Sequence, residues 1–313
     1  MKIYPVLCFI LIIGLASCSR SSGSGGDIEE KYRTGTEGIV LRFLPELPPS
    51  SVFNTYPLTV MVDYRNAGAY TVGNGIIYLS GFDDNYIPFE SQGDCSGAGS
   101  VCGFSNLEGK SIYNPEGLYS RIAEFKTNRV EVSGIDNIDT FTQRIRASVC
   151  YEYQTNAYPV VCIDPTVGKG TVTDKVCSVH PVSLSGGQGA PIAITNVEQE
   201  MAAGSGTQAQ VIFKITIQNV GDGVPFITQP INNCHTELTF TNANYVHVDE
   251  VSFSNNNLNC QPQDVRLSNN KGFTICEGRG SYGTSAFETP LNIQLSYRYR
   301  NSISTEVEIV NIN

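Results

Sequence analysis

Two segments of the chain place hydrophobic residues at every second position, which is the pattern of a half-buried β-strand. Residues 58–65 read LTVMVDYR, and residues 211–218 read VIFKITIQ. Each segment runs directly into the frame Asn-x-Gly, at residues 66–68 in the first case and 219–221 in the second. Because Asn and Gly tolerate positive φ, this frame favours a tight turn. The pattern therefore predicts the same strand-and-turn unit twice.

A second pair of segments matches over a longer stretch. Residues 146–163 (RASVCYEYQTNAYPVVCI) align without a gap to residues 292–309 (NIQLSYRYRNSISTEVEI). Each segment is interpreted as a β-hairpin with one apolar face and a polar turn. Turn-like segments at 114–117 (NPEG) and 269–272 (NNKG) lie between the other landmarks in each half. The common order, at offsets of roughly 146 to 155 residues, indicates an internal duplication.

Short alternating strands, frequent turn residues and no convincing helical period predict an all-β protein of two tandem immunoglobulin-like β-sandwich domains with disulfides. The alternative is a single large two-lobed β-fold. A Gly-rich stretch, residues 182–190, separates the two halves. The expected organisation is a signal peptide at 1–17, a tether at 18–36, a first sandwich at 37–180, a linker at 181–189 and a second sandwich at 190–313.

The amino terminus has the features of an export signal. Lys2 precedes an apolar run, Ile3 to Ala16, that is shorter than the ~20 residues of a transmembrane helix. The run ends in LASC at 15–18, which resembles the lipobox of bacterial-type lipoprotein signals. The resemblance implies cleavage before Cys18 and attachment of a diacylglyceryl group, whose two chains give durable membrane binding. An ordinary signal peptide is the alternative, but the Gly/Ser spacer at 19–26 favours the lipoprotein.

The charge of the chain narrows the classes of partner. It has 20 Lys and Arg residues against 30 Asp and Glu residues, for a formal net charge of -10. Because no basic stripe is present, nucleic acid is not an expected partner. Charged residues make up only 16% of the chain. Together with the short β-rich runs, this low fraction is typical of an exported all-β protein.

Ten cysteines are present, of which Cys8 lies in the signal and Cys18 is the expected lipidation site. The remaining eight are expected to form four disulfides, since exported chains oxidise an even set of thiols. These eight are Cys95, Cys102, Cys150, Cys162, Cys177, Cys234, Cys260 and Cys276. A zinc site is the alternative, but the close Cys pairs typical of zinc ligands are missing.

The spacing of the cysteines suggests some of the bridges. Cys95 and Cys102 flank a Gly/Ser loop and are expected to pair locally. In a hairpin centred near Asn156, Cys150 would lie opposite Cys162 on the polar face. Pairing of Cys162 with Cys177 is the competing possibility. The disulfide partners of the other cysteines stay open.

The strand-and-turn segments VMVDYRNAG (60–68) and FKITIQNVGDG (213–223) resemble CARDB-type immunoglobulin-like modules of prokaryotic cell-surface proteins. The general layout is also similar to exported archaeal proteins, although the cysteine-bearing stretch at 86–140 departs from the plain module. The resemblance implies an adhesion, spacer or recognition role rather than catalysis. It supplies no functional residues.

Motifs for catalysis are missing from the sequence. The three histidines, at 180, 235 and 247, belong to no His-Glu-x-x-His frame, and there is no nucleophile elbow or phosphate loop. We therefore expect no enzyme and no cofactor. Two acidic clusters are weak calcium candidates, because neighbouring loops can supply oxygen ligands, but isolated Asp and Asn runs are more often turns. These candidates are Asp83, Asp84, Asp136 and Asp139.

Tyrosine is abundant, with 16 residues, whereas Trp is absent. An exposed Tyr supplies contact area at low entropic cost. Four tyrosines follow the apolar alternation and are expected in the core, namely Tyr151, Tyr153, Tyr297 and Tyr299. Four others lie in or beside expected loops and form the candidate contact surface, namely Tyr70, Tyr86, Tyr113 and Tyr119.

These observations predict a lipid-anchored protein on the outer face of a membrane in the cell envelope. The expected role is non-catalytic: adhesion, envelope structure or protein interaction, with strand donation or edge pairing as a structural variant. The expected partners are the membrane, through the lipid, and another envelope or surface protein or glycan. The alternative is a lipoprotein that binds a glycan or solute in the cleft between its domains.

Overall fold

The computed structural model describes residues 32–117, 119–132, 139–168, 175–205 and 207–312. The signal peptide, Cys18, most of the tether and Asp136 therefore lie outside the described residues. Within the described ranges the chain is nearly all β, with one short 3-10 helix, η2 (Ile231–Asn233). The predicted all-β sandwich is confirmed, whereas the number of domains stays a prediction. No helix in these ranges is long and apolar enough to span a membrane.

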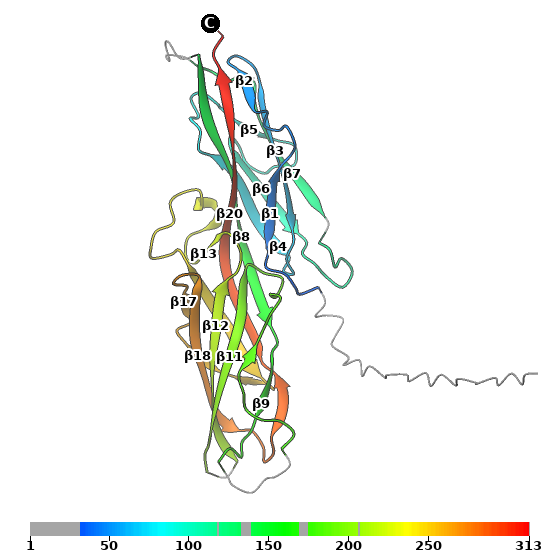
Figure 1. Ribbon diagram of the computed structural model, residues 1–313, viewed down its shortest axis with the longest axis vertical. Coiled ribbons are helices and arrows are strands. Elements are labelled where there is room, and N and C mark those ends of the chain that lie inside the picture. The colour runs from blue at the N-terminus through cyan, green and yellow to red at the C-terminus, as the bar shows by residue number, and fades with distance from the viewer. Residues whose placement is uncertain (1–31, 118, 133–138, 169–174, 206, 313) are drawn as a thin grey trace, which may run out of the picture.

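The strands form two smaller sheets and one long central sheet (Figure 1). Sheet 1 has the order β1 (Ile39–Phe43), β3 (Leu58–Asn66), β7 (Ser120–Thr127) and β5 (Glu90–Gln92). Sheet 2 has the order β10 (Val182–Ser183), β11 (Ile192–Ala203), β12 (Gln208–Asn219), β18 (Lys271–Ser281) and β16 (Asn259–Gln261). Apart from β10, the two sheets match strand for strand, as a duplication requires.

The central sheet contains nine strands. Its main path is β15 (Asn256–Asn257), β14 (Tyr245–Phe253), β20 (Asn292–Val310), β8 (Thr140–Ala157), β4 (Val72–Ser80) and β6 (Val101–Leu107). Three short strands pair beside this path, namely β2 (Ser51–Phe53), β13 (Val224–Phe226) and β17 (Asp264–Arg266). A separate pair joins β9 (Val160–Ile163) with β19 (Phe287–Pro290).

The two longest strands join the halves. β8 and β20 pair antiparallel along the whole length of β8, from Thr140 opposite Val310 to Ala157 opposite Ile293. Figure 1 shows this ribbon running through both halves of an elongated molecule, with the carboxyl terminus beside the first half. Each half therefore includes a stretch of the long strand that the other half contributes.

The predicted hairpins at 146–163 and 292–309 are wrong. The first segment stays extended through Asn156, and the β9 strand that follows pairs with β19 instead of folding back on β8. The second segment is one continuous strand, because its polar stretch pairs with β8 throughout and needs no turn. The alignment itself has a geometric meaning. Glu152 and Arg298 are equivalent in the repeat and also lie opposite each other, so the pseudo-two-fold axis passes through this pair.

The hydrophobic core is continuous through both halves. In β3 every second residue is buried, as the alternation predicts. Tyr64 of sheet 1 contacts Phe104 of the central sheet, with ring centroids 5.0 Å apart. In the second half, Phe213 of sheet 2 lies 6.3 Å from Phe253 of the central sheet. The ring contacts show that sheet 1 and sheet 2 cover successive parts of the same central sheet.

Four buried tyrosines occupy the inner face of the ribbon around the pseudo-two-fold axis, as the sequence predicts. Tyr153 donates its hydroxyl to Asn66 Oδ1 at 3.2 Å, and Tyr299 donates to Asn219 Oδ1 at 3.0 Å. These acceptors are the Asn residues of the two repeated turns, so each turn is tied to the ribbon in the same way. Burial raises the pKa of Tyr151 and its three neighbours, and all four stay neutral donors and acceptors.

The first described residues are held at the waist, which we define as the level of the axis. Gly35 N donates to Gly186 O at 2.8 Å, and Gly189 N donates to Gly35 O at 3.0 Å. The Arg33 guanidinium lies over the ring of Tyr158, 5.5 Å from its centroid. The chain thus enters the fold between the two halves, against the Gly-rich stretch that joins them.

Four disulfides are present among the described residues. Cys95 pairs with Cys102, the local bridge that the Gly/Ser loop suggests. The expected Cys150–Cys162 bridge is wrong because the hairpin it required does not form. Cys162 instead pairs with Cys177. The remaining bridges are Cys150–Cys234 and Cys260–Cys276.

We predict that Tyr153→Phe and Tyr299→Phe each lower the free energy of unfolding by about 1–3 kcal/mol, because each removes a hydroxyl that donates to a buried Asn and accepts from a backbone N–H. Tyr158→Phe is the matched control, since Tyr158 is 40% exposed and its contact with Arg33 needs only the ring. Denaturant unfolding measures the three values. Equal stability of all three variants would contradict the proposed role of the two hydroxyls.

Asp164 makes the stability depend on pH. Burial opposes its ionisation, but hydrogen bonds from Lys175 and Thr166 outweigh that effect and lower the pKa of Asp164. The Lys175 Nζ atom is 2.5 Å from Asp164 Oδ2. Because the folded-state pKa is depressed, the stabilisation is complete above the unfolded-state pKa of about 3.9 and is lost as the pH falls through the folded value.

We therefore expect Asp164→Asn to destabilise the protein by about 1.5–3 kcal/mol at neutral pH and by much less at strongly acidic pH. Urea unfolding of the variant and the parent across this range measures the difference. Asp84→Asn is the control, because Asp84 is exposed. A difference between Asp164→Asn and the parent that does not change with pH would rule out the carboxylate as its source.

Candidate functional site

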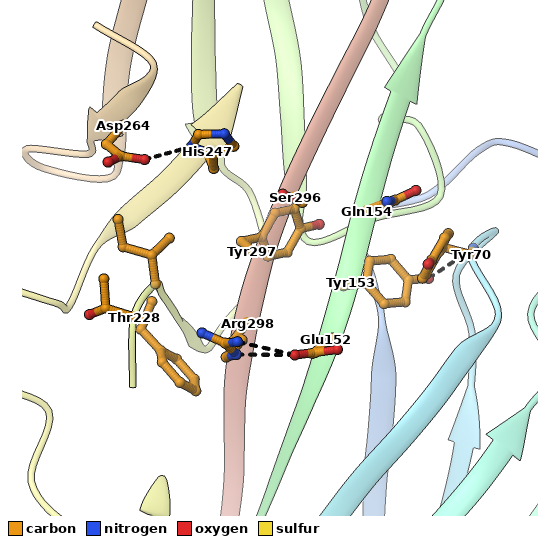
Figure 2. A pocket seen from close by; sticks show the side chains of 12 residues that line it. Tyr70, Glu152, Tyr153, Gln154, Thr228, His247, Asp264, Ser296, Tyr297 and Arg298 are labelled. Atoms are coloured by element: carbon orange, nitrogen blue, oxygen red, sulfur yellow. Dashed lines mark hydrogen bonds and ion pairs between the residues drawn. The ribbon is translucent and has the colours of Figure 1, made fainter. Parts of the chain in front are cut away.

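A depression of about 420 Å³ lies at the waist, on the outer face of the central sheet (Figure 2). Side chains alternate between the faces of a strand, so the residues between the inward tyrosines point outward here. Its floor comes from the long ribbon, with Glu152 on β8 and Arg298 on β20. Residues 226–228, His247 on β14 and Asp264 on β17 line the β20 side, and Tyr70 lies on the β8 side.

The charged side chains in this depression are paired with each other. Arg298 Nη2 lies 3.2 Å from Glu152 Oε1, and His247 Nδ1 lies 2.6 Å from Asp264 Oδ1. Figure 2 shows both pairs at the edges of the same space. Because Arg298 and Glu152 offset each other's charge and Asp264 is hydrogen-bonded to His247, the depression offers polar groups without a strong net field. Such a surface suits a neutral, hydroxyl-rich molecule better than an ion.

A disulfide attaches one wall of the depression to the ribbon. After β13 the chain leaves the second half and crosses the outer face of the central sheet beside the first half. Cys234 in this excursion bonds to Cys150 of β8. Arg300 Nη1 donates to Cys234 O at 3.0 Å, and the Tyr78 hydroxyl donates to the same carbonyl at 3.3 Å. The excursion buries Phe226 against Tyr78 and the disulfide, and this contact holds the wall in place.

The four predicted contact tyrosines have different environments. Tyr70 packs edge-on against Tyr153, with ring centroids 5.5 Å apart, and Tyr86 packs in the same way against Phe141 at 6.1 Å. These two are half-buried and pack against the core, and Tyr70 also lines the depression. Tyr113 is 95% exposed and Tyr119 is 67% exposed, and both lie between β6 and β7.

The acidic calcium candidates do not converge in the part of the chain that is described. Asp83 Oδ1 accepts hydrogen bonds from Asn85 N at 2.9 Å and Asn85 Nδ2 at 2.8 Å, which is the geometry of a turn. Asp139 is exposed at the start of β8, and Asp84 follows Asp83 in its turn. Within the described ranges, no three His, Cys, Asp or Glu side chains gather where they could hold a metal ion.

Sequence reasoning missed the depression because the elements that build it are far apart in the chain. Glu152 and Arg298 had a detectable signal, since the repeat aligns them and gives them opposite charges. His247 and Asp264 had none. Their contact depends on the register between β14 and β17, where the two residues are opposite each other.

No protein-family model matches the chain, and no curated protein matches it. Among solved structures, one match is the crystal structure of the CupB6 tip adhesin from Pseudomonas aeruginosa. It is 10% identical in sequence, and the match covers 89% of this chain and 96% of that chain with a TM-score of 0.15. A likeness at that score carries no argument about function, and the resemblance to CARDB-type modules stays a prediction.

Proposed function

We propose that this chain is an exported, lipid-anchored surface protein that binds other molecules in an adhesion or envelope-structure role and catalyses no reaction. The supporting observation is a group of exposed apolar side chains on an otherwise firmly held frame. Ile112 is 51% exposed, and Tyr113 next to it and Tyr119 further along the same connection are exposed to a greater extent. Large exposed aromatic residues are typical of contact surfaces, where their burial stabilises a complex.

The segment that carries these residues is held in place by hydrogen bonds. Ser111 N donates to Asn114 O at 2.9 Å, and Gly117 N donates to the same carbonyl at 3.3 Å. Lys110 Nζ donates to Thr34 O at 3.4 Å, which joins this segment to the waist. A held segment loses less conformational entropy on binding than a free loop does. The four disulfides support export, because such bridges persist in oxidising compartments.

A glycan- or solute-binding lipoprotein is the second candidate function. The depression at the waist supports it, because its Arg298–Glu152 ion pair and open polar groups match a neutral saccharide. It replaces the expected cleft between two domains, since the ribbon is continuous at this level. Its lining mixes polar residues with Tyr70, Phe226 and Ile227, and the exposed aromatic residues that favour the first candidate lie elsewhere.

The anchor is tested by replacing its cysteine. We expect the full chain, produced in a host that processes lipoproteins, to partition into the detergent phase of Triton X-114, and Cys18→Ser to partition into the aqueous phase. Cys8→Ser is the matched control and should behave as the parent does. Detergent-phase partition of Cys18→Ser would contradict the lipid anchor.

Site-specific photocrosslinking tests the binding role. A photoreactive residue replaces Tyr113 in the anchored protein on intact cells. The same residue replaces Val176 as a control, because Val176 is exposed as well, at 76%. We expect discrete adducts from position 113 and none from position 176. Absence of adducts from both positions, together with saccharide binding that Arg298→Ala abolishes and Arg144→Ala retains, would favour the second candidate.

A further inference from the structure

A groove of about 550 Å³ opens along one edge of the first half, where sheet 1 and the central sheet separate. β7 forms one side and β6 the other, and Tyr64 and Phe104 lie between them. The segment 94–96 closes one end and is held by the Cys95–Cys102 disulfide. The other end of the groove lies at the start of β7, which Tyr119 immediately precedes.

The groove exists because β5 is too short to cover β7. β5 pairs only with residues 124–126 of β7, and its last residue is Gln92. Gly93 then adopts a positive φ of 67°, which turns the chain out of the sheet. Ser96 reaches the other side of the groove and exchanges hydrogen bonds with Gly103 of β6. No described strand occupies the position beside β7 that would continue β5 beyond Gln92, and we call this position the empty row.

The empty row leaves part of a strand edge open. β3 pairs with the whole of β7, but no described strand pairs with residues 120–123 on the opposite side. In an antiparallel sheet, successive residues direct their N–H and C=O groups to alternate sides. Two of these four residues therefore present both backbone groups to the groove. Natural proteins usually cover or blunt such an edge.

Two side chains on this edge define what a neighbouring strand would meet. Arg121 points inward, and its guanidinium donates to Ser105 O at 2.8 Å and Asn106 O at 2.9 Å. Its charge lies in the groove, which Asp94 also lines, and no carboxylate is within ion-pair distance of it among the described residues. Ile122 points outward and is 55% exposed. A strand in the empty row would complement these two side chains if it carried an acidic residue facing inward and an apolar residue facing outward.

The second half serves as an internal comparison, because its strands have the same order. The register places Arg121 opposite Tyr64, and Gly272 in the corresponding position opposite Ile217. A Cβ atom on Gly272 would lie 2.6 Å from Arg266 O and 2.8 Å from Val265 Cγ1. β17 therefore fills the space that is open in the first half. The short strand at this edge is common to both copies, since β16 pairs with only residues 275–277 of β18, but the open space beside it is a feature of the first half.

We propose that an extended segment of another polypeptide binds in this groove by adding to the open edge of β7, in the row that β5 vacates after Gln92. Backbone hydrogen bonds supply affinity, while Arg121 and Ile122 select an acidic residue next to an apolar one. The inference rests on the proposed function and names the class of its partner. Tyr119, which immediately precedes β7 and is 67% exposed, extends the contact surface.

A blocked hexapeptide of alternating valine and glutamate tests this proposal on the complete protein. We expect it to shift the backbone amide resonances of residues 120–123 and to slow their hydrogen exchange. A peptide with glutamine in place of glutamate should bind about tenfold more weakly, equivalent to roughly 1.4 kcal/mol. Alternate N-methylation of the first peptide removes its donors and should abolish binding.

Variants separate recognition from folding. Arg121→Ala should bind the glutamate and glutamine peptides equally, and its melting temperature shows whether the groove is intact. Ile122→Asp should weaken binding without disturbing the core, because Ile122 points outward. Phe273→Asp, at the equivalent position of the second half, should leave binding unchanged. Equal binding of the N-methylated peptide, or shifts confined to other strands, would overturn the proposal.

Light scattering adds a further outcome. A concentration-dependent dimer that Ile122→Asp disperses would replace the peptide with a second copy of the chain and overturn the proposal as stated. If the peptide fails while photocrosslinks from position 113 persist, only this inference fails. Loss of both would remove the proposed function as well.

Discussion

The pairing of β8 with β20 is the constraint on which the rest of the structure depends. Each of these strands crosses the waist, so neither half has a complete central sheet without a strand from the other. The antiparallel register also sets the pseudo-two-fold axis, since equivalent residues Glu152 and Arg298 are partners. The tyrosines on the inner face and the depression on the outer face follow from the same pairing. A long ribbon of this kind has no linker at the waist that could act as a hinge.

The local elements were predictable because they depend on neighbouring residues. Alternation identified β3 and β12, and the Asn-x-Gly frames identified the turns after them. The partner of each strand was not predictable to the same degree. Residues 300–306 are polar enough to suggest a turn, yet they continue β20 because β8 supplies hydrogen bonds along their length. The choice between a turn and an extended strand was therefore made by a segment about 150 residues away.

The difference between contacts that are local in sequence and contacts that are distant also explains which parts of the candidate site were predictable. Cys95 and Cys102 are close in sequence, so their bridge follows from the loop between them. Cys150 pairs with a residue in an excursion that has no counterpart in the repeat, and no spacing rule indicates it. The tyrosines divide in a similar way. Tyr113 is exposed, whereas Tyr70 is covered by a ring from the ribbon that its own sequence neighbourhood does not reveal.

The hydrogen bonds between Gly35 and the Gly-rich stretch have a mechanical consequence. A force applied through the chain that precedes Tyr32 enters the molecule at the middle of its long axis and not at either tip. The two halves then act as opposing lever arms about one pivot. Drag on one arm balances drag on the other, so a steady flow produces little net torque. A contact made by one arm alone upsets this balance and tilts the whole body about the pivot.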